Sequence, residues 1–180
     1  MPPKKLKFRR YLGAPRRYVR RRGFGIHSPF AFDFVLRVIS QPCRYYCYPR
    51  LDEAARQAGM KRKVLRLIFR VALFFRPQSV EVIGSSQAVE TAVGEAAPAG
   101  EGRGPRMIVV TAAPDSSQAE KIGKCMSQGA IVVFTGLRHH RDAVAGLWSS
   151  ADRGMLFRGS DTAVYVGLRH LPRQQFNVWI

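Results

Sequence analysis

The sequence predicts an α/β protein: a Rossmann-like, mostly parallel sheet with antiparallel terminal strands, preceded by a basic helical N-terminal extension. Three observations carry this prediction. After Pro77, short runs rich in β-branched residues alternate with helical segments, which favours parallel strands joined by helical crossovers. Before Pro77, the apolar residues recur at helical spacing. Residues 155–180 contain three short apolar runs separated by turns, so we expect the last strands to run antiparallel.

Charge divides the chain into two unequal parts. It has 30 lysine and arginine residues against 12 aspartate and glutamate residues. Residues 1–76 hold 20 of the basic and 3 of the acidic side chains, whereas residues 77–180 hold 10 and 9. The 180 residues suffice for one domain with a substantial core. We therefore expect a basic tail over residues 1–23, a helical extension over 24–76 and a shortened Rossmann-like domain over 77–180.

The basic tail contains ten lysine and arginine residues and no acidic residue. It has too few apolar groups to fold alone, so we expect it to be mobile. Such a segment can bind RNA or another polyanion by displacing counterions from phosphates, and the aromatic residues among the charges can stack on bases. The alternative is a solvated basic tail without a specific partner. The candidate anion-binding residues are Arg16, Arg17, Arg20, Arg21 and Arg22.

Targeting and membrane signals are weak in this sequence. The charged start lacks the apolar core of a secretory signal, and its first serine is Ser28, whereas organelle transit peptides are rich in serine. The longest apolar run, residues 64–75, is interrupted by Arg66 and Arg70 and is too short to span a bilayer. We therefore expect a cytoplasmic protein without a transmembrane segment.

The cysteines give little reason to expect a metal. An odd count of three suits a reducing compartment better than a disulfide framework. Cys43 and Cys47 are spaced as CxxxC, but no second Cys or His pair stands near them to complete a tetrahedral zinc site. We expect no metal.

Three helices are predicted in the front half. Ser28 can accept a hydrogen bond from the first turn of a helix over residues 28–40, and Pro29 suits the first helical position. A brief helix over residues 51–58 and a stronger one over residues 61–75 follow. The stronger helix carries arginines at every fourth position, 62, 66 and 70. This stripe either faces outward from a helix packed on the sheet or lies on a membrane surface.

The back half is predicted as strands and helices in alternation. The helices follow the strands until residue 151, and Asp115 or Ser116 can cap the second of them. The predicted strands cover residues 79–84, 107–111, 130–135, 155–158, 163–168 and 175–180, and the predicted helices cover residues 87–97, 116–128 and 141–151.

The opening motif Phe24-Gly25-Ile26-His27-Ser28-Pro29-Phe30 resembles the His-Gly-x-His-Ser-Pro-Phe opening of a family of bacterial class I S-adenosylmethionine-dependent methyltransferase-like proteins. A helix like residues 63–77 precedes the nucleotide-binding strand in that family, and residues 167–180 are similar to its ending. The resemblance implies a Rossmann-like sheet with S-adenosylmethionine as its cofactor, held at the carboxyl ends of the central strands.

The resemblance places the cofactor at the segment "VEVIGSSQA", residues 80–88. Its candidate cofactor-binding residues are Glu81, Gly84, Ser85 and Ser86. Gly84 fits the glycine-rich turn, where the backbone can approach a ligand. Val82 stands at the usual acidic position, so Glu81 is one residue out of phase and on the opposite face unless the strand bulges. An ordinary tight turn is the alternative, since such turns also use glycine.

His139 and His140 follow the strand "IVVFT" and are the candidate catalytic residues, because a base at a strand's carboxyl end can serve methyl transfer. The alternative is a solvated turn beside Arg138 and Arg141. The family tends to place acidic residues here and at the end of strand two, and this chain does not.

The interval after the cofactor turn is also short. Only 22 residues separate Gly84 from Met107, so we expect six strands where the complete fold has seven. The resemblance thus implies a methyltransferase-like protein with incomplete chemistry. The other hypothesis is a non-catalytic protein that binds RNA or another polyanion through its N-terminal half.

Overall fold

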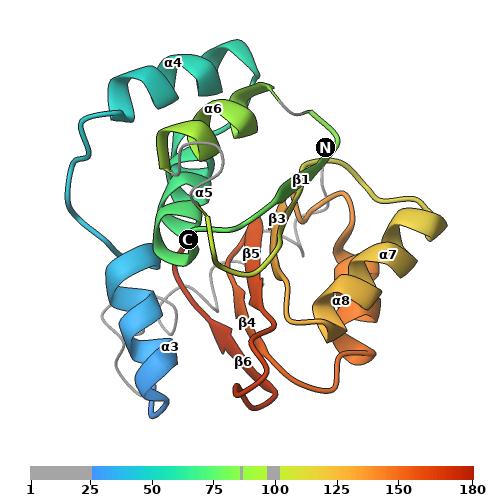
Figure 1. The fold of residues 1–180 in the computed structure, drawn as a ribbon. Helices are drawn as coiled ribbons and strands as arrows, with labels where there is room; N and C mark the ends of the chain where they lie inside the picture. Colours follow the sequence, from blue (N-terminus) through green and yellow to red (C-terminus); the bar gives the residue numbers. More distant parts are fainter. Residues whose placement is uncertain (1–25, 86, 97–101) are drawn as a thin grey trace, which may run out of the picture.

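The computed structural model describes residues 26–85, 87–96 and 102–180. They form a layered α/β fold in which one six-stranded sheet separates two groups of helices (Figure 1). The order of the strands across the sheet is β1-β2-β3-β5-β4-β6. The predicted fold class is therefore confirmed. The strands are β1 (Val80–Ile83), β2 (Met107–Val110), β3 (Ile131–Thr135), β4 (Met155–Arg158), β5 (Thr162–Val166) and β6 (Gln174–Asn177).

The front half is helical, as predicted. Helix α3 (Pro29–Phe34) begins where the Ser28 hydroxyl accepts a hydrogen bond from the amide of Ala31 at 3.3 Å. It continues into a π-helical turn, η2 (Val35–Ile39), which sequence periodicity did not indicate. The remaining front helices are α4 (Tyr48–Gln57) and α5 (Arg62–Phe75).

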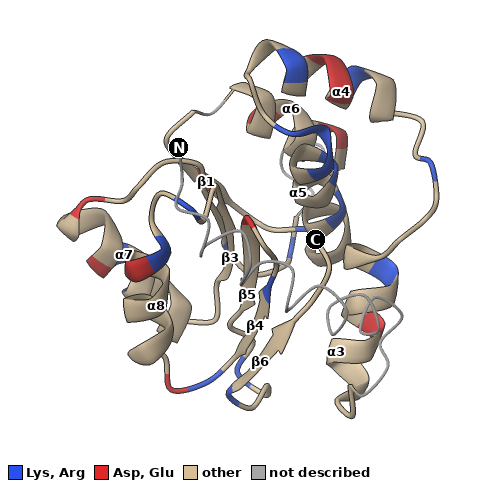
Figure 2. Cartoon of the chain, turned by 180° about the vertical axis from the view of Figure 1, so that it is seen from behind, with Lys and Arg blue, Asp and Glu red and all other residues tan. Residues whose placement is uncertain are grey.

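The arginine stripe of α5 faces other parts of the protein. Arg66 makes two hydrogen bonds to the carboxylate of Asp52 on α4, at 2.8 and 2.5 Å. Arg70 donates to the carbonyl oxygen of Val38 at 2.5 Å, which satisfies the end of η2. Figure 2 marks these basic positions along α5, close to α4. Since Arg66 and Arg70 are occupied in this way, neither the outward-facing stripe nor the membrane-surface reading describes them.

Three further helices connect or follow the parallel strands: α6 (Gln87–Ala96), α7 (Ser116–Ser127) and α8 (Arg141–Ser149). The predicted cap of α7 is Asp115, whose carboxylate accepts from the amide of Gln118 at 2.8 Å. The Gln118 side chain in turn accepts from the amide of Asp115 at 3.1 Å, which completes a capping box.

The end of the chain differs in part from the prediction. Strand β5 runs antiparallel to β3 and to β4, as the turn signals indicated. Strand β6, however, pairs with β4 in parallel. Both edges of β5 are already occupied by β3 and β4. The chain therefore reverses after β5 and adds β6 to the free edge of β4, in the direction of β4.

Alternation along the strands sends side chains into two separate cores. Met107, Val109 and Phe157 point to the face covered by α3, η2, α4, α5 and α6, which we call the α5 face. Ile108 and Leu156 point to the face covered by α7 and α8, which we call the α7 face. The helical segment before Pro77 therefore supplies most of one layer of the domain, which α6 completes. It shares its core with the sheet and does not stand apart as an extension.

The two crossovers between the parallel strands have opposite hands. The chain places β2 beside β1 and then β3 beside β2, which are two steps in the same direction across the sheet. The connecting helices nevertheless lie on opposite faces, α6 on the α5 face and α7 on the α7 face. Two steps in one direction over opposite faces cannot share a hand. We assign the usual right hand to the β2–α7–β3 unit, so that β1–α6–β2 is left-handed, a hand found in only about 2% of such connections.

None of the helices within the described ranges combines the length and the apolar character that crossing a membrane requires. The three cysteines are free thiols. Across the residues that the structure describes, no three His, Cys, Asp or Glu side chains are grouped as metal ligands would be.

Candidate functional site

Strands β1, β2, β3, β4 and β6 all point the same way, so their carboxyl ends lie together at one edge of the sheet, which we call the carboxyl edge. Ligands of open α/β sheets bind outside this edge. The two sites predicted from the sequence, the Gly84 turn and the histidine pair, both lie here, after β1 and after β3. Their geometry determines what the edge can hold.

The Gly84 turn is exposed to solvent, and residues that follow β2 pack against its backbone. Gly84 has a φ of +106°, which favours glycine. A Cβ atom added to it would lie 2.3 Å from the Oγ1 of Thr111 and 2.9 Å from the backbone nitrogen of Ala112. The Thr111 hydroxyl donates to the carbonyl oxygen of Ile83 at 3.1 Å and lies 3.4 Å from that of Ser85. Thr111 and Ala112, the residues after β2, therefore pack directly against the backbone of this turn.

The acidic residue of β1 does not reach this turn. Glu81 pairs in register with Ile108, and the β1–β2 ladder is regular without a bulge. Its side chain points to the α7 face, where its carboxylate lies 2.5 Å from the ammonium group of Lys121 on α7. Ser85 is exposed, and Ser86 lies outside the described residues. The four predicted cofactor residues thus do not converge in the part of the chain that the structure describes.

The described part of the connection from β1 to β2 contains no further strand of the kind that the resemblance implies for holding a ribose. Between Gly84 and Met107 the described residues contain α6 and no named strand. Strands β2 and β3 are followed by Thr111 and Gly136 rather than by carboxylates. The hydroxyl of Thr135, the last residue of β3, donates to the carbonyl oxygen of Val110 at 3.3 Å. The described edge therefore lacks the carboxylates with which the resembling family would hold S-adenosylmethionine.

The two histidines after β3 are in different environments. His139 is exposed, as a solvated turn predicts. His140 is the N-cap residue of α8 and is only 6% exposed, so the solvated-turn alternative is wrong for it. Neither of its ring nitrogens has a hydrogen-bond partner among the described residues. Burial lowers the pKa of His140, and the neighbouring His139 lowers it further, against the weaker opposing effects of the Thr135 backbone and Asp161.

Further charged residues lie at this edge of the sheet, and Asp161 is near enough to His140 to affect its pKa. Asp161, in the turn between β4 and β5, forms an ion pair with Lys61 and lies 3.7 Å from the guanidinium of Arg138. Arg158, the last residue of β4, is half-buried, and its guanidinium has no ion pair or hydrogen bond within the described ranges. Its pKa is lowered by burial and by the charge of Arg141. Arg158 was not among the site residues predicted from the sequence, although alternation along "MLFR" places its side chain on the same face as that of Leu156.

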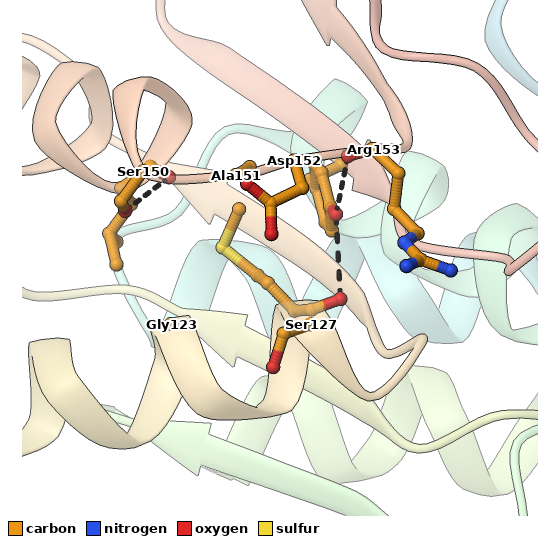
Figure 3. A pocket seen from close by; sticks show the side chains of 9 residues that line it. Gly123, Ser127, Ser150, Ala151, Asp152 and Arg153 are labelled. Atoms are coloured by element: carbon orange, nitrogen blue, oxygen red, sulfur yellow. Dashed lines mark hydrogen bonds between the residues drawn. The ribbon is translucent and has the colours of Figure 1, made fainter.

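A small pocket lies at the opposite edge of the sheet (Figure 3). It has a volume of about 60 Å³ and is lined by residues from the end of α7 and from the segment after α8, including Ser127, Asp152 and Arg153. The Tyr165 hydroxyl donates to the carbonyl oxygen of Arg153 at 2.9 Å. Pockets for drug-sized ligands measure about 300–1,000 Å³. This pocket is too small for a nucleoside, and it is remote from the carboxyl edge.

The candidate anion-binding residues Arg16, Arg17, Arg20, Arg21 and Arg22 lie outside the described residues. Comparisons of the chain with models of protein families, with curated proteins and with solved structures found no match.

Proposed function

We propose that this chain is a methyltransferase-like protein that no longer catalyses methyl transfer and instead binds a polyanion, with RNA as the leading ligand. The carboxyl edge of the sheet carries this proposal. Where the resemblance calls for a glycine turn with carboxylates nearby, the edge has a turn against which Thr111 and Ala112 pack, and no carboxylate directly follows β2 or β3. Near the end of β3 it has Arg138, His140 and Arg141.

The hand of the first crossover supports descent from a larger sheet. On the α5 face, a right-handed crossover from β1 would deliver the next strand to the free edge of β1, away from β2. Helix α6 lies on that face, yet the chain returns to β2. This arrangement is expected if the strands beyond β1 were lost while the helix after β1 kept its place. The ribose-binding carboxylate of the family would have been lost with them.

The charge of the chain supports a polyanionic ligand. The formal net charge is +18, and residues 1–23 contribute ten basic side chains without an acidic one. A segment of this kind gains free energy by releasing counterions from phosphates, and its aromatic residues can stack on unpaired bases. RNA as the ligand is consistent with a cytoplasmic location, which is part of the same proposal.

Fluorescence anisotropy with a labelled single-stranded RNA tests this function. We expect the logarithm of the association constant of the full chain to fall linearly with the logarithm of the salt concentration, with a slope of about −0.7 per phosphate neutralised. Deleting residues 1–23 should remove most of the affinity and most of the slope. A deletion variant that binds as tightly as the full chain would refute the proposal.

A matched variant separates the contribution of the tail's charge to RNA affinity from the contribution of its aromatic residues. Replacing the tail aromatics Phe8, Tyr11 and Tyr18 by leucine preserves the charge of the tail. We expect this variant to keep the salt slope and to lose roughly tenfold or more in affinity, since stacking contributes about 1–3 kcal/mol per base. Unchanged affinity would leave the charges as the sole determinant and would contradict the stacking part of the proposal.

A further inference from the structure

We propose that the folded domain binds a phosphate group at the N-terminus of α8, between the guanidinium groups of Arg141 and Arg158 and beside the imidazole of His140. This site is separate from RNA binding by residues 1–23, and it stands or falls independently of it. It combines side chains from the end of β4 and from the first residues of α8, which the fold brings to the same face of the carboxyl edge.

Arg158 is the first observation. It follows Phe157 on β4, so it points to the α7 face, together with Leu156 and toward the layer that contains α8. Its guanidinium is half-buried, and within the described residues it has no carboxylate or hydrogen-bond partner. The positive charge close enough to perturb it is Arg141. Two neighbouring arginines, one of them half-buried and unpaired, are destabilising unless an anion lies between them.

His140 is the second and independent observation. The residue is only 6% exposed, and neither ring nitrogen makes a hydrogen bond of normal geometry within the described residues, although the Thr135 backbone lies close enough to raise its pKa. Buried polar groups nearly always have a partner, which can be a ligand or water. The ring lies at the N-cap of α8 near the Gly136 turn, since a Cβ added to Gly136 would lie 3.9 Å from the Cε1 atom of His140. A donor in this position can reach an anion at the end of the helix.

The helix supplies the remaining donors. Helix α8 spans nine residues, and its N-cap residue makes no side-chain hydrogen bond to the first turn. The amide groups of a first turn are unpaired within the helix and attract anions. The cross-strand neighbours of Arg158 are Ala163 on β5 and Asn177 on β6, and neither carries a charge.

Two acidic residues are close to the site. Asp142 lies in the first turn of α8 and is exposed. Asp161 is engaged by Lys61 and Arg138, so its charge is already balanced. The positive charge of Arg141, Arg158 and the helix N-terminus therefore exceeds the negative charge of Asp142. A phosphate fits this surplus better than a carboxylate, because it carries more charge and more acceptor oxygens for guanidinium groups and backbone amides.

The test compares the melting temperature of the full chain in inorganic phosphate with that in chloride at equal ionic strength. We expect about 10 mM phosphate to raise the melting temperature of the wild-type chain by about 3–5 °C. Arg158→Gln should abolish this rise and should leave the melting temperature in chloride unchanged or higher, because an unpaired half-buried charge is removed. The matched control is Arg169→Gln, an exposed arginine at the other edge, which should retain the full response.

Nuclear magnetic resonance supplies a second measurement on the same chains. The ring signals of His140 should shift on addition of phosphate in the wild-type and Arg169→Gln chains and stay in place in Arg158→Gln. If phosphate raises the melting temperature of Arg158→Gln as much as that of the wild-type chain, or leaves the His140 ring signals unmoved in the wild-type chain, the site does not exist.

The source of the phosphate is identified with two RNA oligonucleotides, one with a 5′-phosphate and one with a 5′-hydroxyl group. A preference for the 5′-phosphate that disappears in Arg158→Gln identifies an RNA end as the ligand. Equal affinities, together with the response to inorganic phosphate, identify a small phosphorylated molecule. In either case Arg158→Gln should keep the salt-dependent RNA binding of residues 1–23, so failure of this site and failure of the proposed function give different results.

Discussion

Replacing Gly84 by alanine tests whether this glycine serves the chain's own packing. The added Cβ atom would lie 2.3 Å from the Oγ1 of Thr111, and it would lie 2.9 Å from the backbone nitrogen of Ala112. Such distances are far inside van der Waals contact, and one of the two atoms belongs to the backbone. The φ of +106° is also strained for alanine.

The expected loss follows from three contributions. A non-glycine residue in a rare backbone region costs about 1–3 kcal/mol. Displacing the Thr111 hydroxyl from its hydrogen bond to Ile83 costs about 1 kcal/mol more. Alanine restricts the unfolded chain and returns about 0.4–1 kcal/mol. The free energy of unfolding should therefore fall by about 2–3 kcal/mol.

Urea unfolding followed by circular dichroism measures this loss. Gly94→Ala is the control, because Gly94 lies in α6 and a Cβ added to it meets nothing within 4 Å. That variant should be about 0.5–1 kcal/mol more stable than the wild-type chain. If Gly84→Ala has the same urea midpoint and slope as the wild-type chain, Thr111 and Ala112 do not pack tightly against this turn.

Three other perturbations have defined outcomes. Phe34→Ala should lower the free energy of unfolding by about 3–5 kcal/mol, because this fully buried ring joins α3 to α5 and β4, whereas Phe32→Ala, at a 43% exposed ring, should cost much less in the same urea titration. Asp52→Asn should cost about 1–2 kcal/mol by removing a part-buried charge from a doubly hydrogen-bonded guanidinium, while Glu53→Gln on the exposed side of α4 should cause no measurable change. Because burial lowers the pKa of His140 below its ordinary 6.5, the unfolded chain binds this proton more readily, so stability should decline as the pH falls from 6.5 toward the folded-state pKa. His140→Gln should flatten that decline in urea titrations repeated across the range, and an unchanged pH profile would show that the ring is not buried in neutral form.

The fold was largely predictable because its signals are local. The Asp115 cap, the apolar runs of β2 and β3 and the helical spacing of α5 each depend on nearby residues, and all appear in the structure. The direction of β6 depends instead on which strand edges remain free after β5 has paired on both sides, which no local pattern encodes. The opposite hands of the two crossovers are likewise a property of the assembled sheet.

The candidate site was predictable in position but not in character. Gly84 and the histidine pair were placed correctly at strand ends, since parallel strands bring their carboxyl ends together. The packing of Thr111 against the glycine joins residues from two strands, and the burial of His140 depends on neighbours distant in sequence. Arg158 was not predicted as a site residue, because the sequence alone does not show that the charge of Arg141 acts on the end of β4.

We propose that this protein does not bind a nucleoside cofactor at the Gly84 turn, because the described residues there lack the carboxylates that the resemblance calls for. Isothermal titration calorimetry of the full chain with S-adenosylmethionine tests it most directly, with S-adenosylhomocysteine as a second titrant. We expect no binding heat from either at millimolar concentration, from a preparation that binds RNA. Saturable binding in the micromolar range, weakened by Gly84→Ala, would contradict the claim and restore the turn after β1 as a cofactor site.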